Sequence, residues 1–253
     1  MPSFKVGVQL QPQHTSVAEM RAAWQAADAM GANSIWTWDH FYPLYGPADG
    51  AHFEGQSLLA AMAVTTSQAQ FGMLVTCNSY RNPELLADMA RTIDHLSNGR
   101  FVLGVGAGWF ERDYTEYGFN FGTAGERLAA LGDALPRIKA RLAQLNPAPI
   151  GPLPLLIGGS GPKKTLRMVA EHADMWNSFG PPENYARLNS ILDNWCDEVG
   201  RPRDAVERTV FLQPNEVDDY GAFVEAGAQH LIVGIQTPFD LSGVETLLAA
   251  AGH

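Results

Sequence analysis

The sequence predicts an α/β protein of the (β/α)8 TIM-barrel class. Short apolar runs rich in β-branched and aromatic residues alternate with longer amphipathic runs, which is typical of βαβ units around a parallel sheet. We count about eight strand–helix pairs, and the chain has 253 residues, which is close to the usual length of such a barrel. A doubly wound sheet usually has fewer strands and a glycine fingerprint after the first one, whereas QLQPQH (9–14) follows here.

Each predicted strand is a short run of apolar, β-branched or aromatic residues. The predicted strands are 4–10, 34–39, 70–77, 101–108, 153–159, 174–180, 207–213 and 230–236. The predicted helices between them are 17–30, 57–67, 83–96, 124–145, 163–173, 183–199, 218–226 and 241–251. In the first helix Met20, Trp24 and Ala27 recur at roughly helical spacing before Gly31, and the helix from Pro83 opens with proline. We expect one domain over residues 1–253, because no linker interrupts the pattern.

Composition narrows the class of protein. With 46% hydrophobic and 17% charged residues the chain is globular in type, and no apolar stretch approaches the roughly 20 residues of a membrane helix. The net charge of -10 disfavours nucleic acid as a partner. Two cysteines, Cys77 and Cys196, are too few for a disulfide framework, so we expect a cytoplasmic location. The opening MPSFKVGVQL (1–10) is interpreted as the first strand rather than as a signal peptide.

In such barrels the chemistry lies at the carboxyl ends of the strands. The second strand ends in TWDHFYPLYG (37–46), where Asp39 and His40 lie among aromatic residues. A histidine in that position can donate or accept a proton near neutral pH. The alternative is a buried, hydrogen-bonded histidine in an aromatic loop, and the residues alone favour neither.

The third and fourth strands also end in distinctive segments. The third strand ends in MLVTCNSYRNP (73–83), which becomes polar at Thr76, Asn78 and Arg81. These residues could form a ligand site or a turn that caps the next helix, and the sequence slightly favours the turn. In LGVGAGWFERDY (103–114), glycines at every second position from Gly104 leave one face of the strand bare. Either a flat ligand or another side chain could lie against that face.

Two carboxylates follow the glycines of the fourth strand. Glu111 and Asp113 could form an acid/base pair, but a solvated loop face is the favoured interpretation.

The fifth strand leads into LPLLIGGSGPKK (153–164). Glycines allow backbone N–H groups to converge on an anion, and a helix that begins near Pro162 would direct its positive end to the same place. Lys163 and Lys164 add charge. The spacing is not that of a P-loop, so phosphate binding is only slightly favoured over a tight turn.

No metal site is expected, because the histidines show no HExxH or other metal-ligand spacing. No serine lies in a nucleophile elbow. These absences favour a cofactor that carries the chemistry itself.

Together, three segments resemble the bacterial-luciferase-like superfamily, and within it the oxidoreductases that use coenzyme F420, an 8-hydroxy-5-deazaflavin. They are WTWDHFYPLYG (36–46), LVTCNSYRNPELLADMARTIDHLSNGRFVLGVGAGWFERDYTEYG (74–118) and LPLLIGGSGPKKTLRMVAEHADMWN (153–177). The resemblance covers nearly the whole chain. It implies a barrel with the deazaflavin across the strand mouths, hydride transfer to or from an organic substrate, and a homodimer. An FMN-dependent monooxygenase is the alternative, and a non-catalytic barrel is a third hypothesis.

The resemblance also assigns residues. It implies that His40 is the catalytic proton donor or hydride-transfer partner and that Asp39 binds the hydroxylated end of the ring. A non-proline cis peptide between Leu74 and Val75 is implied behind the ring. The remaining implied cofactor contacts are Thr76 and Asn78 on the ring or ribityl chain, Gly106, Ala107 and Gly108 beside the ring, and Gly158, Gly159, Ser160, Gly161 and Lys163 at the phosphate.

The sequence departs from one group in this family. The sugar-phosphate dehydrogenases carry a catalytic tryptophan and glutamate where this chain has Leu44 and Trp109, so a sugar phosphate is not predicted as substrate. The predicted substrate pocket is aromatic, with Trp38, Tyr42, Trp109 and Phe110, and with Trp36 and Phe41 beside them. We therefore expect a hydrophobic or aromatic small-molecule substrate.

Overall fold

The strands form a closed parallel barrel. The computed structural model describes residues 4–252, and in that range the strands are β1 Lys5–Leu10, β2 Ser34–Thr37, β3 Gln70–Met73, β4 Thr76–Cys77, β5 Phe101–Gly106, β6 Leu155–Gly158, β7 Met175–Phe179, β8 Glu207–Leu212 and β9 His230–Ile235. β1 pairs with both β2 and β9, which closes the sheet. β3 and β4 both pair with β5, so together they occupy one of the eight strand positions of the barrel. The predicted eight-fold barrel is therefore confirmed, and residues 1–3 and 253 of the predicted domain lie outside the described residues.

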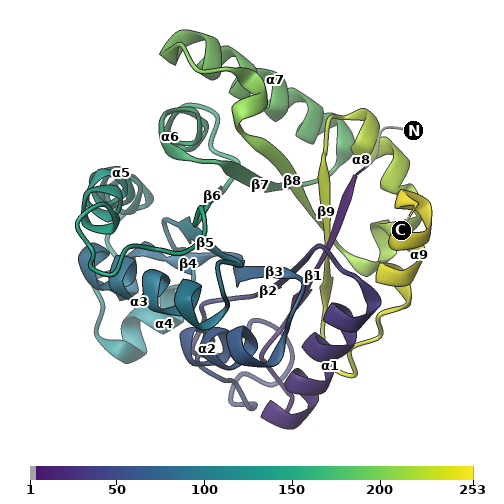
Figure 1. Ribbon diagram of the computed structural model, residues 1–253. Helices are drawn as coiled ribbons and strands as arrows, with labels where there is room; N and C mark the ends of the chain where they lie inside the picture. The colour runs from purple at the N-terminus through teal and green to yellow at the C-terminus, as the bar shows by residue number, and fades with distance from the viewer. Residues whose placement is uncertain (1–3, 253) are drawn as a thin grey trace.

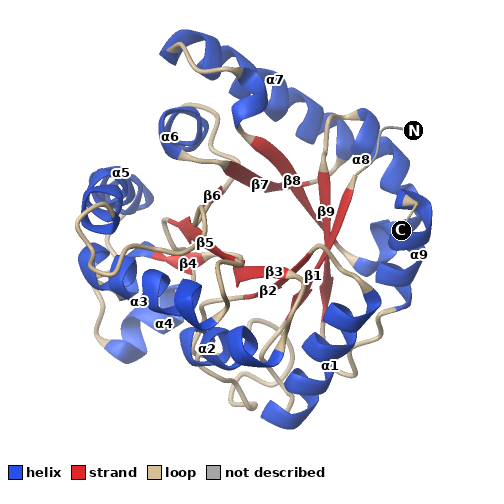
Figure 2. Ribbon diagram, viewed as in Figure 1, coloured by secondary structure: helices blue, strands red, loops and turns tan. Residues whose placement is uncertain are grey.

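Helices surround the barrel (Figures 1 and 2). They are α1 Val17–Met30, α2 Gly55–Thr65, α3 Pro83–Leu96, α4 Glu111–Tyr117, α5 Ala124–Leu142, α6 Thr165–His172, α7 Pro182–Val199, α8 Tyr220–Glu225 and α9 Ser242–Ala251, with single 3-10 turns at Asn78–Tyr80, Arg203–Ala205 and Pro214–Asp219. α1 and α3 have the predicted bounds. Their ends are fixed by local chemistry, because Ser16 forms a capping box and Asn82 accepts two backbone hydrogen bonds ahead of Pro83.

The structure corrects two predicted elements and adds a third that the sequence did not predict. The strand predicted at 70–77 is interrupted at 74–75, between β3 and β4. Residues 162–164 form a turn, so α6 begins at Thr165 rather than near Pro162. α4 was not predicted, since its seven residues are too few for a clear helical period; it begins after Phe110 and ends at Gly118 in the left-handed conformation.

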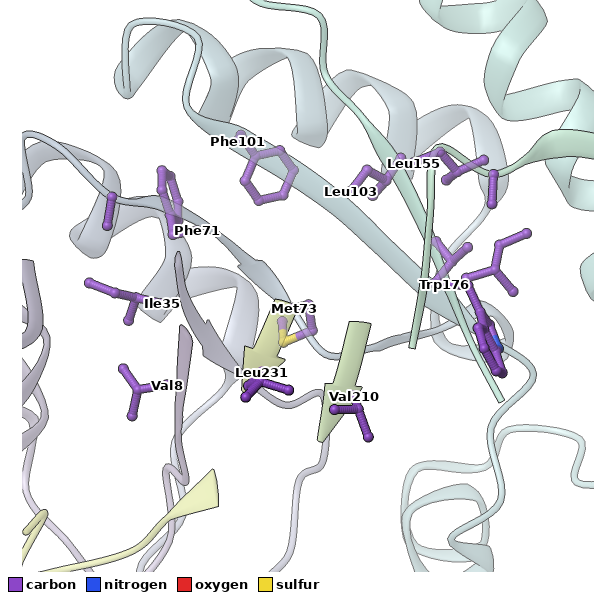
Figure 3. Packing of buried hydrophobic residues seen from close by; sticks show 14 of the residues in the cluster. Val8, Ile35, Phe71, Met73, Phe101, Leu103, Leu155, Trp176, Val210 and Leu231 are labelled. Atoms are coloured by element: carbon purple, nitrogen blue, oxygen red, sulfur yellow. The ribbon is translucent and has the colours of Figure 1, made fainter. Parts of the chain in front are cut away.

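Apolar side chains pack on both faces of the barrel wall. Residues such as Val8, Ile35, Phe71 and Leu231 belong to the cluster between strands and helices, part of which Figure 3 shows. A second cluster, Trp36, Val102, Leu156, Met175 and Ile232, is fully or almost fully buried on the other face of the strands. Strands that are buried on both faces have continuous apolar sequences, which is usual for parallel strands. None of the helices in the described range has the length and apolar character that a membrane crossing needs.

Candidate active site

A cavity of about 360 Å³ lies at the carboxyl ends of the strands. This is the size of pocket that holds one small organic ligand. The predicted site residues in its lining are Trp38, Asp39, His40, Leu74, Val75, Gly106, Ala107, Gly108, Trp109, Gly158 and Gly159. The predicted residues outside the lining are Tyr42, Thr76, Asn78, Phe110, Ser160, Gly161 and Lys163. Most of the predicted site is therefore brought together at one cavity.

His40 is held by Asp113, one of the two carboxylates that follow the glycines of the fourth predicted strand. Its Nδ1 lies 2.8 Å from Oδ2 of Asp113, which is completely buried. Asp113 had been interpreted as part of a solvated loop face, and that interpretation is wrong because α4 carries Asp113 into the protein. No hydrogen bond joins Nε2 of His40 to any residue in the described range, and His40 lines the cavity.

The surroundings of Asp113 fix which atom of His40 carries a proton. Oδ1 of Asp113 accepts the backbone N–H groups of Phe41 and Tyr42 at 3.1 and 3.2 Å. Its Oδ2 accepts the hydroxyl of Tyr80 at 3.1 Å as well as the hydrogen bond with His40. Three donors besides His40 surround this carboxylate, which only accepts, so Nδ1 of His40 is the fourth donor. Nε2 is then the ring nitrogen that is available to a ligand in the cavity.

Aromatic edges enclose the His40 ring. Trp38 and Trp109 lie at centroid distances of 5.7 Å and Phe110 at 5.4 Å, all in edge-on geometry. Phe110 thus packs on His40 without lining the cavity. Tyr42 is placed elsewhere, under the guanidinium of Arg112 at 3.9 Å.

The other predicted aromatic residues have structural positions. Trp36 is fully buried in the interior cluster, and Phe41 packs on Tyr80 and Tyr117. Of the predicted pocket aromatics, Trp38 and Trp109 line the cavity, and the other aromatic lining residues are Tyr45, Tyr80, Phe179 and Phe211.

Asp39 is committed to an internal ion pair. Its carboxylate accepts two hydrogen bonds from Arg81, at 2.6 and 3.0 Å, and the backbone N–H of Cys77 at 2.9 Å. Arg81 also donates to Glu54 at 2.8 Å. Arg81 is therefore no free anion site, and Asn82 caps α3, which agrees with the capping-turn interpretation of this segment.

The back wall of the cavity is formed by Leu74 and Val75. The peptide bond between them is cis, as the family resemblance implied. Nε2 of Gln9 donates to the carbonyl of Leu74 at 2.9 Å. A Cβ at Gly106 or Gly158 would lie 2.6 or 2.9 Å from Val75. Of the two alternatives for the bare face of β5, the structure thus shows a side chain, Val75, packed against it.

The loop after β6 has unused backbone donors. The N–H of Gly159 donates to Asn177, but within residues 4–252 the N–H groups of Ser160 and Gly161 donate to nothing. The hydroxyls of Ser160 and Ser178 lie 2.7 Å apart. Lys163 and its neighbour Lys164 are exposed on the turn that follows. Free N–H groups beside lysines suit a phosphate or another anion.

A luciferase-like TIM barrel is the class that this fold and cavity define. The chain belongs to the luciferase-like monooxygenase family, whose model matches residues 2–240. It is 27% identical over 202 residues to the F420-dependent glucose-6-phosphate dehydrogenase of Amycolatopsis mediterranei, an alignment that covers 73% of this chain and 59% of that protein.

Two solved structures show the same fold. An F420-dependent secondary alcohol dehydrogenase in complex with an F420–acetone adduct has a TM-score of 0.86 at 14% identity, over 99% of both chains. The oxygenating constituent of 3,6-diketocamphane monooxygenase from the CAM plasmid of Pseudomonas putida, in complex with FMN, has a TM-score of 0.73 at 14% identity, over 97% of both chains. Similar barrels therefore occur with either cofactor.

Proposed function

We propose that this protein is a coenzyme F420-dependent oxidoreductase that acts on a hydrophobic or aromatic organic substrate. The observation that carries the proposal is His40, whose Nδ1 is held by the buried Asp113 while Nε2, at the cavity, has no partner in the described part of the chain. In this role Nε2 donates a proton to the substrate or accepts one from it. Asp113 is a positioning residue, because it fixes the proton on Nδ1.

The residues present fit a flat cofactor with an anionic tail. Leu74 and Val75 would support one face of the ring, and the N–H groups of Ser160 and Gly161 would hold the phosphate. Lys163 would meet the acidic tail. The bound deazaflavin supplies hydride chemistry that the side chains lack. The side chains would bind and orient the cofactor and the substrate, and Trp38 and Trp109 would exclude water from them. His40 would transfer the proton.

A flavin monooxygenase is the second candidate, supported by the family and by the FMN-bound neighbour. The two cofactors share a ring shape and a phosphate, so the same loop would serve both. The chemistry differs, because reduced FMN reacts with oxygen in monooxygenases whereas deazaflavin transfers hydride. A non-catalytic barrel is less well supported, since it would leave the positioned His40–Asp113 pair without a use.

Titration of the purified protein with F420 and with FMN tests the proposal. We expect micromolar binding of F420 and binding of FMN at least about tenfold weaker, followed by changes in cofactor absorbance or fluorescence. Micromolar binding of FMN without binding of F420 would overturn the choice of cofactor.

Two glycine variants provide a matched control for the titration. Gly159→Ala strains a left-handed backbone position in the loop, and we expect cofactor binding to weaken about tenfold. Gly200→Ala imposes a similar strain at the end of α7, far along the chain from the strand mouths, and should leave binding unchanged.

A further inference from the structure

Three glutamines occur at alternate positions along β1 and the segment that follows it. Gln9, Gln11 and Gln13 are 5%, 7% and 1% exposed. Gln9 donates to the carbonyl of Leu74, and Oε1 of Gln13 accepts the N–H of Leu44 at 2.8 Å. Gln11 lines the cavity, and its buried Oε1 has no hydrogen-bond partner among residues 4–252. The middle glutamine therefore has a polar group to offer a ligand.

A buried amide oxygen without a partner is unfavourable, and a ligand that donates an N–H or O–H satisfies it. Rotation of the side-chain amide by half a turn presents its N–H group instead, so Gln11 can also bind a carbonyl oxygen. Its position suits the reacting end of a ligand. β1 is the neighbour of β2, which leads to His40. β9, β8 and β7 separate β1 from β6 and from the loop after β6 that suits an anion.

Apart from His40, whose ring is paired with the carboxylate of Asp113, the described lining of the cavity offers no counter-ion to an ionic substrate. Within the described residues, its lining contains no lysine or arginine, and its one carboxylate, Asp39, is paired with Arg81. A carboxylate or ammonium group placed there would lose its hydration without gaining a counter-ion. An uncharged substrate avoids that loss.

The rim of the cavity is aromatic. Tyr45, Trp109 and Phe179 are 55%, 62% and 55% exposed, and all three belong to the lining. Tyr45 and Trp109 follow β2 and β5, and Phe179 is the last residue of β7. Large exposed aromatic side chains around a pocket indicate contact with an apolar ligand surface.

We propose that the substrate is an uncharged molecule with a flat apolar body and one polar group, such as an aryl ketone, an enone or the matching alcohol, and that Gln11 recognises the polar group. The proposal deepens the proposed function and rests on it for the reaction. Recognition itself requires only binding, so the two proposals can fail separately.

Equilibrium binding of three ligands of related shape tests the proposal. They are 4-phenyl-3-buten-2-one, a neutral ketone; cinnamate, which has a carboxylate in place of the acetyl group; and trans-β-methylstyrene, which lacks the carbonyl. Dialysis or ligand-observed NMR is carried out with the protein alone and with the cofactor that the titration identifies. We expect the ketone to bind at least about tenfold more tightly than cinnamate.

The variant Gln11→Met removes the amide and keeps the length of the side chain. It should weaken ketone binding about tenfold and leave binding of the hydrocarbon unchanged. Its unfolding temperature should not fall, because an unpartnered amide is replaced by an apolar group. Gln25→Met, on the exposed face of α1, is the control and should change neither affinity.

The outcomes are distinct. Cinnamate that binds as tightly as the ketone would overturn the uncharged class, and an equal loss for ketone and hydrocarbon in Gln11→Met would overturn the role of Gln11. If no cofactor binds but the ketone binding depends on Gln11, recognition is supported and the proposed function fails.

Discussion

Two histidine–carboxylate pairs lie at opposite ends of the barrel. His40 and Asp113 meet beyond the carboxyl end of β2, and His230 and Glu207 meet at the first residues of β9 and β8. In both pairs Nδ1 lies 2.8 Å from a carboxylate oxygen. Distance alone therefore does not distinguish them.

The second nitrogen does distinguish them. Nε2 of His230 lies 2.8 Å from the hydroxyl of Ser34, and that hydroxyl accepts the indole N–H of Trp36 at 2.6 Å. The ring of His230 is completely buried, and burial lowers its pKa below the ordinary value. A neutral His230 satisfies every partner, because Ser34 then donates to Nε2 and Nδ1 donates to Glu207.

Serine, histidine and glutamate thus form the connectivity of a hydrolase triad at a place that no substrate reaches. Ser34 and His230 are both fully buried, and neither lines the cavity at the other end. His40 differs because its Nε2 has no partner among residues 4–252 and its ring borders the cavity. The comparison teaches that access to the second nitrogen, rather than the carboxylate pair, marks a histidine for catalysis.

The largest expected effect separates the two histidines. His40→Ala should lower kcat by about 100-fold or more, since general acid–base groups contribute at least that much, and should barely change the unfolding temperature. His230→Ala should destabilise the fold by about 2–4 kcal/mol, because it leaves a cavity in place of a fully buried ring and removes the partner of the buried Ser34 hydroxyl. Turnover and urea unfolding of both variants provide the measurement. Unchanged turnover of every responsive substrate in His40→Ala would remove its proposed proton role.

A smaller effect is expected from Asp113→Asn. The amide can accept from the backbone N–H groups of Phe41 and Tyr42 only if its NH2 group faces Tyr80 and His40, and a donor there forces the proton of His40 from Nδ1 to Nε2. We expect kcat to fall by about 10- to 100-fold with KM nearly unchanged. Nitrogen-15 shifts of the His40 ring, measured by NMR, report which nitrogen carries the proton.

Asp94→Asn is the matched control for this variant. Asp94 is also a fully buried carboxylate that accepts two backbone N–H groups, from Ile150 and Gly151, but it lies in the last turn of α3. The Asp94→Asn variant should have a lower free energy of unfolding and an unchanged kcat. An equal loss of kcat in both variants, with the His40 proton still on Nδ1, would mean that Asp113 acts only through the fold.

The barrel could be predicted from sequence because its signals are local. Apolar runs, the capping residues Ser16 and Asn82 and the terminal Gly31 each fix an element within a few residues. The break between β3 and β4 and the turn before α6 were missed, since they depend on tertiary contacts such as Val75 against the glycines of β5 and β6.

The candidate site was only partly predictable, for a similar reason. His40 stood out among aromatic residues, but Asp113 follows it by 73 positions, and only the fold brings the two together. The spacing of Gln9, Gln11 and Gln13 was a usable signal, because alternate residues of a strand share one face. Among the described residues both Oε1 of Gln11 and Nε2 of Gln13 lack a partner, and only the structure could show that Gln11 is the one of these two that lines the cavity.

The smallest effect concerns acid stability and tests whether His230 is neutral. Its folded pKa is lowered from 6.5, so the unfolded chain binds the additional proton first and stability is lost as the pH falls below about 6.5, by at most about 1.4 kcal/mol per pH unit. Burial lowers the pKa of His52 to about 4, which adds a similar loss, and burial also lowers that of His172. Although burial acts to raise it, hydrogen bonds from His230 and Lys5 lower the pKa of Glu207 to about 2, so the contribution of Glu207 to stability is lost only below about pH 4.5.

Urea unfolding between about pH 7.5 and 5 should give a shallower pH dependence for His230→Gln than for the native protein, because one of the titrating groups is gone. An identical slope would show that His230 binds its proton as readily in the folded protein as in the unfolded chain, and the contrast between a neutral structural histidine and a proton-exchanging one at the cavity would lose its basis.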